Sequence, residues 1–148
     1  MTTTTTQSLT LKVSRHIKAS RERVFAAWST ADMLVQWLGG GSTKLISSSI
    51  DLRAGGDYRL KASGGHCDMD MVGEFREVKP PERLVFTWSV GNCLPEYKGM
   101  QSLVTVELTE QKGGTLVQLT HEGFPDTVIR DRHDHGWNAS FDALEKLV

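Results

Sequence analysis

The sequence predicts a single α+β domain in which seven antiparallel strands form a curved sheet around a long C-terminal helix. Three patterns predict it: apolar and polar residues alternate over residues 9–17, strand-length alternations separated by turn residues fill residues 42–124, and a helical apolar repeat follows Pro125. A chain of 148 residues is long enough to bury a sufficient core without a disulfide or a metal.

The composition excludes several classes of protein. With 39% hydrophobic residues, 24% charged residues and a formal net charge of −1, the chain has neither a disordered nor a nucleic-acid-binding composition. No apolar run approaches the ~20 residues needed to cross a bilayer, and the threonine-rich start lacks the apolar core of a signal peptide. We therefore expect a cytoplasmic protein with no membrane partner, with residues 1–8 as a disordered tail and residues 9–148 as the domain.

Two short helices are expected after the first strand. Ser20 can cap the first helix, Thr30 can cap the second, and the glycines at residues 39–41 end the second helix. Turn residues at 54–57, 63–65, 79–82, 91–99 and 112–114 then divide residues 42–124 into six strands. Connections this short join antiparallel neighbours, so the six strands form a meander.

The last element is expected to be a long amphipathic helix, with Pro125 in its first turn and Asp126 adding favourable charge there. Residues that form a stripe recur at intervals of three or four: Ile129, His133, Trp137, Phe141, Leu144 and Val148. This stripe must pack on the apolar face of the meander. The pattern alone leaves open whether the inward residues fill a core or line a cavity.

Six segments, in order and spanning nearly the whole chain, carry a family resemblance: residues 17–28 (IKASRERVFAAW), 50–56 (IDLRAGG), 79–88 (KPPERLVFTW), 119–124 (LTHEGF), 136–137 (GW) and 141–144 (FDAL). They resemble the START-like (SRPBCC) helix-grip superfamily, which is related to polyketide cyclases and is also called Bet v 1-like. Within it they are most similar to the branch named after the homologue of the activator of Hsp90 ATPase. The resemblance implies a β-α-α-β6-α domain with an apolar tunnel between sheet and C-terminal helix.

The resemblance implies three functions. The first is binding of a small apolar or aromatic molecule in the tunnel. The second is an enzyme of the cyclase or aromatase kind that uses a pocket histidine or tyrosine. The third is a co-chaperone or stress-response role; because the namesake carries a further N-terminal domain that this sequence does not contain, we do not expect a chaperone partner. A homodimer formed through a strand edge stays open.

The expected ligand-binding residues lie on the inward strand faces and on the helices that cover them: Trp37, Tyr58, Leu60, Met69, Met71, Phe75, Phe86, Trp88, Val106, His121, His133, Trp137 and Phe141. The ligand would enter between the last helix, the second short helix and residues 91–99. Trp37, Trp88 and Trp137 are candidates for an aromatic wall, with ordinary core packing as the alternative. Gly136 could widen the gap under the helix.

No catalytic residue is assigned. His121 and His133 should approach each other and could bind a polar ligand group or move a proton, unless both are hydrogen-bonded core residues. We expect no metal, since His133 and His135 point to different faces and residues 66–68 lack a second ligand pair. No nucleotide or redox-cofactor motif occurs, so no cofactor is expected. Asp51 and Arg53 are expected to form a structural ion pair, and Cys67 and Cys93 to be reduced, unreactive thiols.

Overall fold

The computed structural model describes residues 9–39, 44–63, 68–91 and 101–148. It has the expected β-α-α-β6-α order, and the elements are β1 (Leu9–Ile17), α1 (Arg21–Ser29), α2 (Ala31–Trp37), β2 (Lys44–Ile50), β3 (Asp57–Ser63), β4 (Asp68–Lys79), β5 (Arg83–Gly91), β6 (Ser102–Gln111), β7 (Gly114–Phe124) and α3 (Thr127–Leu147). The fold class predicted from the sequence is confirmed. The expected N-terminal tail, Cys67, Cys93 and the segment 92–100 lie outside the described residues.

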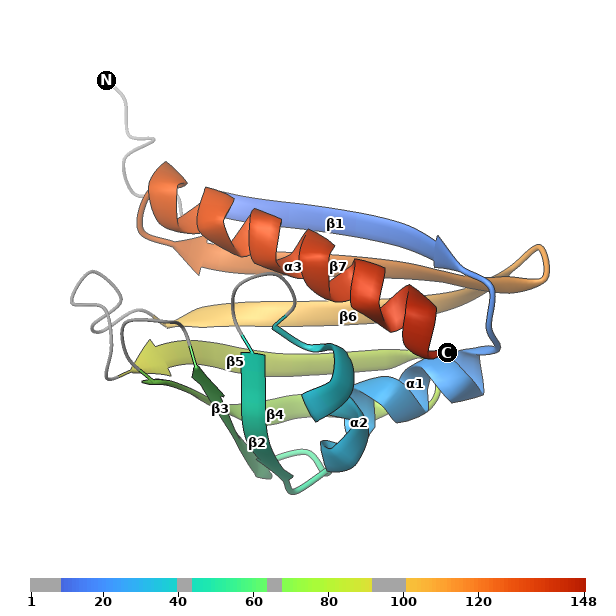
Figure 1. Cartoon of the computed structure of the whole chain (residues 1–148), viewed down its shortest axis with the longest axis horizontal. Helices are drawn as coiled ribbons and strands as arrows, with labels where there is room; N and C mark the ends of the chain where they lie inside the picture. The colour runs from blue at the N-terminus through green and yellow to red at the C-terminus, as the bar shows by residue number, and fades with distance from the viewer. Residues whose placement is uncertain (1–8, 40–43, 64–67, 92–100) are drawn as a thin grey trace.

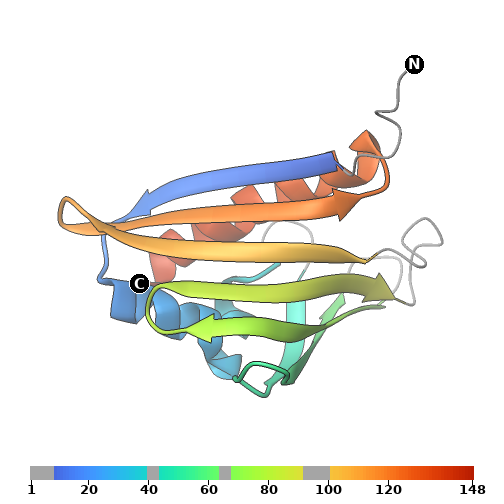
Figure 2. The same ribbon diagram turned by 180° about the vertical axis from the view of Figure 1, so that it is seen from behind.

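The seven strands form one antiparallel sheet in the order β1-β7-β6-β5-β4-β3-β2. Each of β2 to β6 pairs with its successor, and β1 closes the other edge by pairing with β7, where Val13 lies opposite Leu119. Helix α3 crosses the concave side of this sheet, and α1 and α2 cover one end of it (Figure 1). Seen from behind, β1 and β7 lie in front of α3 (Figure 2). The core therefore lies between the sheet and α3.

The helix ends follow local capping chemistry. Ser20 Oγ accepts a hydrogen bond from the backbone N–H of Arg23, as expected, whereas the side chain of Thr30 makes no capping bond to α2. The expectation that Pro125 lies in the first turn of α3 is wrong. Asp126 is the N-cap, with extended backbone and with Oδ1 accepting from the N–H of Ile129, so the helical conformation begins only at Thr127.

The predicted inward residues are buried on β3, β5, β6 and β7. On β4 the outcome is mixed, because Met71 and Phe75 are buried while Met69 is only partly buried. Sterics require a glycine at position 73 of β4, because a Cβ atom at Gly73 would lie 2.0 Å from Thr87 O and 2.6 Å from Tyr58 Oη. The missing side chain lets Tyr58 of β3 reach over β4 and donate a hydrogen bond to the Thr87 carbonyl of β5.

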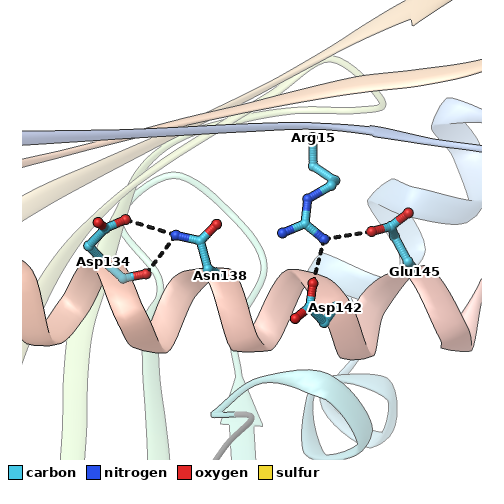
Figure 3. A network of polar contacts seen from close by, with 5 residues as sticks. All are labelled: Arg15, Asp134, Asn138, Asp142 and Glu145. Carbon is cyan, nitrogen blue, oxygen red and sulfur yellow. Dashed lines mark hydrogen bonds and ion pairs between the residues drawn. The ribbon is translucent and has the colours of Figure 1, made fainter.

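An ion-pair cluster fixes one edge of α3 to the sheet. Arg15 of β1 points at the helix, and its Nη1 lies 2.8 Å from Asp142 Oδ1 and 2.5 Å from Glu145 Oε1 (Figure 3). The guanidinium carbon also lies 5.9 Å from the centre of the Phe141 ring. The hydrogen bond to Glu145, assisted by Asp142, raises the pKa of Arg15. The C-terminal half of α3 is thereby held against β1.

Two glycine-to-alanine substitutions should have opposite effects on stability. Gly73→Ala should lower the free energy of unfolding by about 3 kcal/mol, because the new methyl group clashes with the Thr87 carbonyl and displaces the Tyr58 hydroxyl. Gly136→Ala, at a helix position where a Cβ meets nothing within 4 Å, should raise it by about 1 kcal/mol through helix propensity. Urea unfolding followed by tryptophan fluorescence measures both, and a Gly73→Ala variant as stable as wild type would contradict this packing.

Candidate functional site

An open pocket of about 150 Å³ lies between α3 and the strands beneath it. We call it the outer pocket. It takes residues from the end of α2, from β4, from β5 and from one face of α3: Leu38, Gly39, Met69, Met71, Trp88, Val90, Arg132, His133, Gly136, Trp137 and Ser140. Gly136 lies beside this space, since a Cβ atom added at that position would meet nothing within 4 Å.

A smaller, deeper space of about 30 Å³, the inner pocket, continues the apolar interior toward α1. Its lining is aromatic and aliphatic: Trp28, Leu34, Leu38, Ile50, Tyr58, Leu60, Phe75, Phe86, Trp88 and Trp137. Leu38, Trp88 and Trp137 line both pockets and so form the boundary between them.

The two boundary indoles are held by the two histidines. Trp88 Nε1 donates to His133 Nε2 at 3.2 Å, and His133 Nδ1 lies 3.0 Å from the carbonyl oxygen of Ile129 one turn earlier in α3. An indole N–H can only donate, so His133 Nε2 must be the unprotonated nitrogen and Nδ1 must carry the hydrogen. The imidazole is therefore neutral with both nitrogens engaged.

His121 is engaged in the same way from the other side. Trp137 Nε1 donates to its Nδ1 at 3.1 Å, so its Nε2–H donates to Ser102 Oγ at 2.8 Å. The Ser102 hydroxyl in turn donates to the carbonyl oxygen of Trp88 at 2.7 Å. His121 is fully buried, and the chain of bonds runs from α3 through β7 and β6 to β5.

The expected approach of the two histidines is present, with ring centres 5.2 Å apart. Burial, with a smaller effect of His133, lowers the pKa of His121 to about 2. Burial also lowers the pKa of His133, and the hydrogen bond to the Ile129 backbone offsets part of this lowering. Burial raises the pKa of Tyr58, whose hydroxyl is engaged by Thr87. In this arrangement the basic nitrogen of each histidine already accepts an indole hydrogen, which works against a role as general base.

Nine of the thirteen expected ligand-binding residues line the two pockets. Met69, Met71, Trp88, His133 and Trp137 line the outer pocket, and Tyr58, Leu60, Phe75 and Phe86 line the inner one. The linings do not include the other four, which are Trp37, Val106, His121 and Phe141.

The expected aromatic wall is present in part. Trp88 and Trp137 pack with ring centres 5.4 Å apart and face both pockets. Trp37 instead donates from Nε1 to the carbonyl of Ala27 and packs edge-on against Trp28, at 4.7 Å. Trp28 of α1, rather than Trp37, adds the third indole, since it lines the inner pocket and lies 5.9 Å from Trp137.

Several lining residues were not expected from the sequence: Trp28, Leu34, Leu38, Gly39, Ile50, Val90, Arg132 and Ser140. The spacing of Arg132, Gly136 and Ser140 could have identified Arg132 and Ser140 as lining residues from the sequence. The three are four residues apart, on a helical ridge beside the apolar stripe. Ser140 also accepts from the N–H of Gly39 at 2.9 Å, which fixes the end of α2 to α3 at the pocket rim.

The remaining expectations concern charge and metals. Arg53 Nε lies 3.0 Å from Asp51 Oδ2 in the exposed turn after β2, so the expected structural ion pair is present. Among the described residues no three histidine, cysteine or acidic side chains gather as metal ligands would. Within the same residues no helix has the length and apolarity to cross a membrane.

The buried neutral histidines predict a pH dependence of stability. Below about pH 6.5 the unfolded chain takes up a proton at His121, whereas burial lowers the pKa of His121 in the folded chain to about 2. The free energy of unfolding should therefore fall as the pH is lowered from 7 to 5.5, with His121 contributing up to about 1.4 kcal/mol per pH unit below the unfolded pKa. In the His121→Gln variant this slope should shrink, whatever the stability at pH 7. Urea unfolding measures the slope, and equal slopes in both proteins would contradict a neutral His121.

Comparison with known proteins agrees with this architecture. Protein CV1439 from Chromobacterium violaceum has a TM-score of 0.81 at 24% identity, covering 94% of this chain and 96% of that one. Mll3558 from Rhizobium loti has a TM-score of 0.80 at 25% identity, covering 95% of this chain and 97% of that one. CalU16 from Micromonospora echinospora has a TM-score of 0.71 at 23% identity, covering 97% of this chain and 78% of that one. These likenesses show the helix-grip fold.

Among curated proteins no sequence matches the chain. The sequence profile of the family described as "Activator of Hsp90 ATPase homolog 1-like protein" matches residues 18–148, which is most of the chain. The chain belongs to the activator of Hsp90 ATPase homolog 1-like family.

Proposed function

We propose that this chain binds a compact apolar molecule, about one aromatic ring in size, in the outer pocket. The observation that carries the proposal is the space of about 150 Å³ under Gly136, bounded by Met69, Met71, Trp88 and Trp137. An enclosed apolar cavity of about this volume accommodates benzene, and the outer pocket offers a comparable volume that is open on one side and mainly apolar. Two methionines beside two indoles form an adaptable surface for a flat apolar ligand.

The side chains of the site favour binding over acid–base chemistry. An enzyme of the cyclase or aromatase kind needs a pocket group that can take a proton from its substrate. Here the acceptor nitrogens of His121 and His133 and the hydroxyl of Tyr58 are engaged by protein partners. Moving one of them to a substrate would first leave an indole N–H or a carbonyl without its partner, at a cost of roughly 1–3 kcal/mol.

A chaperone-binding role has less support from the surface. Protein partners are usually bound through a contiguous exposed apolar patch. Among the described residues the large exposed apolar side chains are Ile46, Leu52, Val72 and Val128, which come from β2, the turn after it, β4 and α3. Small-molecule binding therefore stays the function that the geometry supports best.

Filling the outer pocket should abolish binding. In wild-type protein, α-methylstyrene at millimolar concentration should raise the melting temperature and change tryptophan fluorescence, because Trp88 and Trp137 face the ligand. Gly136→Leu should remove both responses, because its side chain occupies the space that the ligand needs. Calorimetric titration measures the affinity directly.

His135→Leu is the matched control, because it places the same side chain on the same helix at an exposed position. It should bind like wild type. Two results would contradict the proposal: no saturable binding of one-ring aromatic molecules to wild type, or binding that survives Gly136→Leu.

A further inference from the structure

Trp28 is the one indole of the four in the chain without a hydrogen-bond acceptor among the described residues. Trp37 donates to Ala27 O, Trp88 to His133 and Trp137 to His121. Trp28 is only 4% exposed, and its Nε1 is buried without a partner. A buried donor left in this state costs free energy, and native proteins leave few such groups.

The position of Trp28 connects this donor to the proposed site. Trp28 lines the inner pocket, whereas the other buried side-chain nitrogen without a partner among the described residues, Arg21 Nε, belongs to a residue that lines neither pocket. The other polar groups of the inner lining have partners: the Tyr58 hydroxyl donates to Thr87, and the indole N–H groups of Trp88 and Trp137 donate to the two histidines. Trp28 Nε1–H is therefore the donor without a partner, among the described residues, that belongs to a residue of the inner lining.

We propose that the ligand carries an uncharged oxygen acceptor, such as a ketone or aldehyde carbonyl, which enters the inner pocket and accepts a hydrogen bond from Trp28 Nε1. The apolar body of the same ligand occupies the outer pocket, so this inference rests on the proposed function. A space of about 30 Å³ suits one or two heavy atoms and excludes a ring. A carboxylate is disfavoured, because an ionised group in this apolar lining would lose its hydration against a single neutral donor.

The boundary between the two pockets has one adaptable part. The indoles of Trp88 and Trp137 are fixed by their bonds to His133 and His121. Leu38, the third residue common to both linings, is aliphatic and lies just past the end of α2. In this proposal Leu38 is the residue that changes rotamer, so that the carbonyl of a ligand in the outer pocket reaches Trp28 while both histidine bonds stay in place.

Two matched probes test the assignment: acetophenone, and α-methylstyrene, in which a CH₂ group replaces the carbonyl oxygen. Their affinities are measured by calorimetry for the wild-type chain and for Trp28→Phe, which keeps an aromatic ring and removes the N–H. The ratio of ketone affinity to alkene affinity should fall roughly three- to tenfold in the variant. Using this ratio cancels the different hydration of the two probes.

A spectroscopic measurement identifies the donor without relying on the stability of the variant. In ¹H–¹⁵N spectra of the wild-type chain, we expect the indole N–H signal of Trp28 to shift when a ligand with a carbonyl oxygen binds. Acetophenone should move it downfield, as a new hydrogen bond requires, and α-methylstyrene should not. The signal missing from Trp28→Phe gives the assignment.

The outcomes separate the two proposals. If α-methylstyrene binds and Gly136→Leu abolishes it, but the affinity ratio and the Trp28 signal are insensitive to the carbonyl, the function stands and this inference is overturned. The inference is overturned as well if Trp28 Nε1 keeps a buried water in the presence of either probe. If neither probe binds wild type at millimolar concentration, both proposals fall.

Discussion

Two hydrogen bonds from tryptophan to histidine organise the interior of this domain. Trp88 donates to His133 across the gap between β5 and α3, and Trp137 donates from α3 to His121 on β7. Because an indole nitrogen cannot accept, these bonds require neutral imidazoles and fix which nitrogen carries the hydrogen. They also fix the planes of the two indoles that separate the outer pocket from the inner one. The hydrogen bonds to the two imidazoles therefore position the apolar faces of Trp88 and Trp137 between the two pockets.

The two edges of α3 have different roles. Toward β1 the helix is clamped by Arg15, which pairs with Asp142 and Glu145 in the last turns. On the other side, Gly136 contributes no side chain, and the space that remains belongs to the outer pocket. The contacts with β1 on one edge and the missing side chain on the other leave a ligand-sized space beside a continuous core.

The fold could be predicted almost completely, because it depends on periodicities that the sequence displays directly. The period of two predicted the inward faces of β3, β5, β6 and β7. The period of three to four predicted four buried residues of α3, which are Ile129, Trp137, Phe141 and Leu144, whereas His133 and Val148 of the expected stripe are only partly buried. The start of α3 was misplaced because capping depends on the backbone conformation of Asp126, which composition does not reveal.

The site could be predicted only in part. Apolar pattern does not distinguish a residue that lines a pocket from one that packs in the core, so Val106 and Phe141 were grouped with Met71 and Phe86 although they lie outside both linings. Polar lining residues such as Arg132 and Ser140 are assigned to solvent by any apolar-polar pattern. The hydrogen-bond partners of His121 and His133 come from three different elements and depend on the tertiary structure.

A mainly apolar, ligand-sized space lies between Gly136 of α3 and Trp88 of β5. Crystals of the protein under xenon pressure test it most directly, since xenon occupies apolar cavities that water avoids. We expect a xenon site in contact with Met71, Trp88 and Trp137, with the indole-to-imidazole bonds unchanged. Side chains or ordered waters filling that space, with no xenon beneath Gly136, would contradict it.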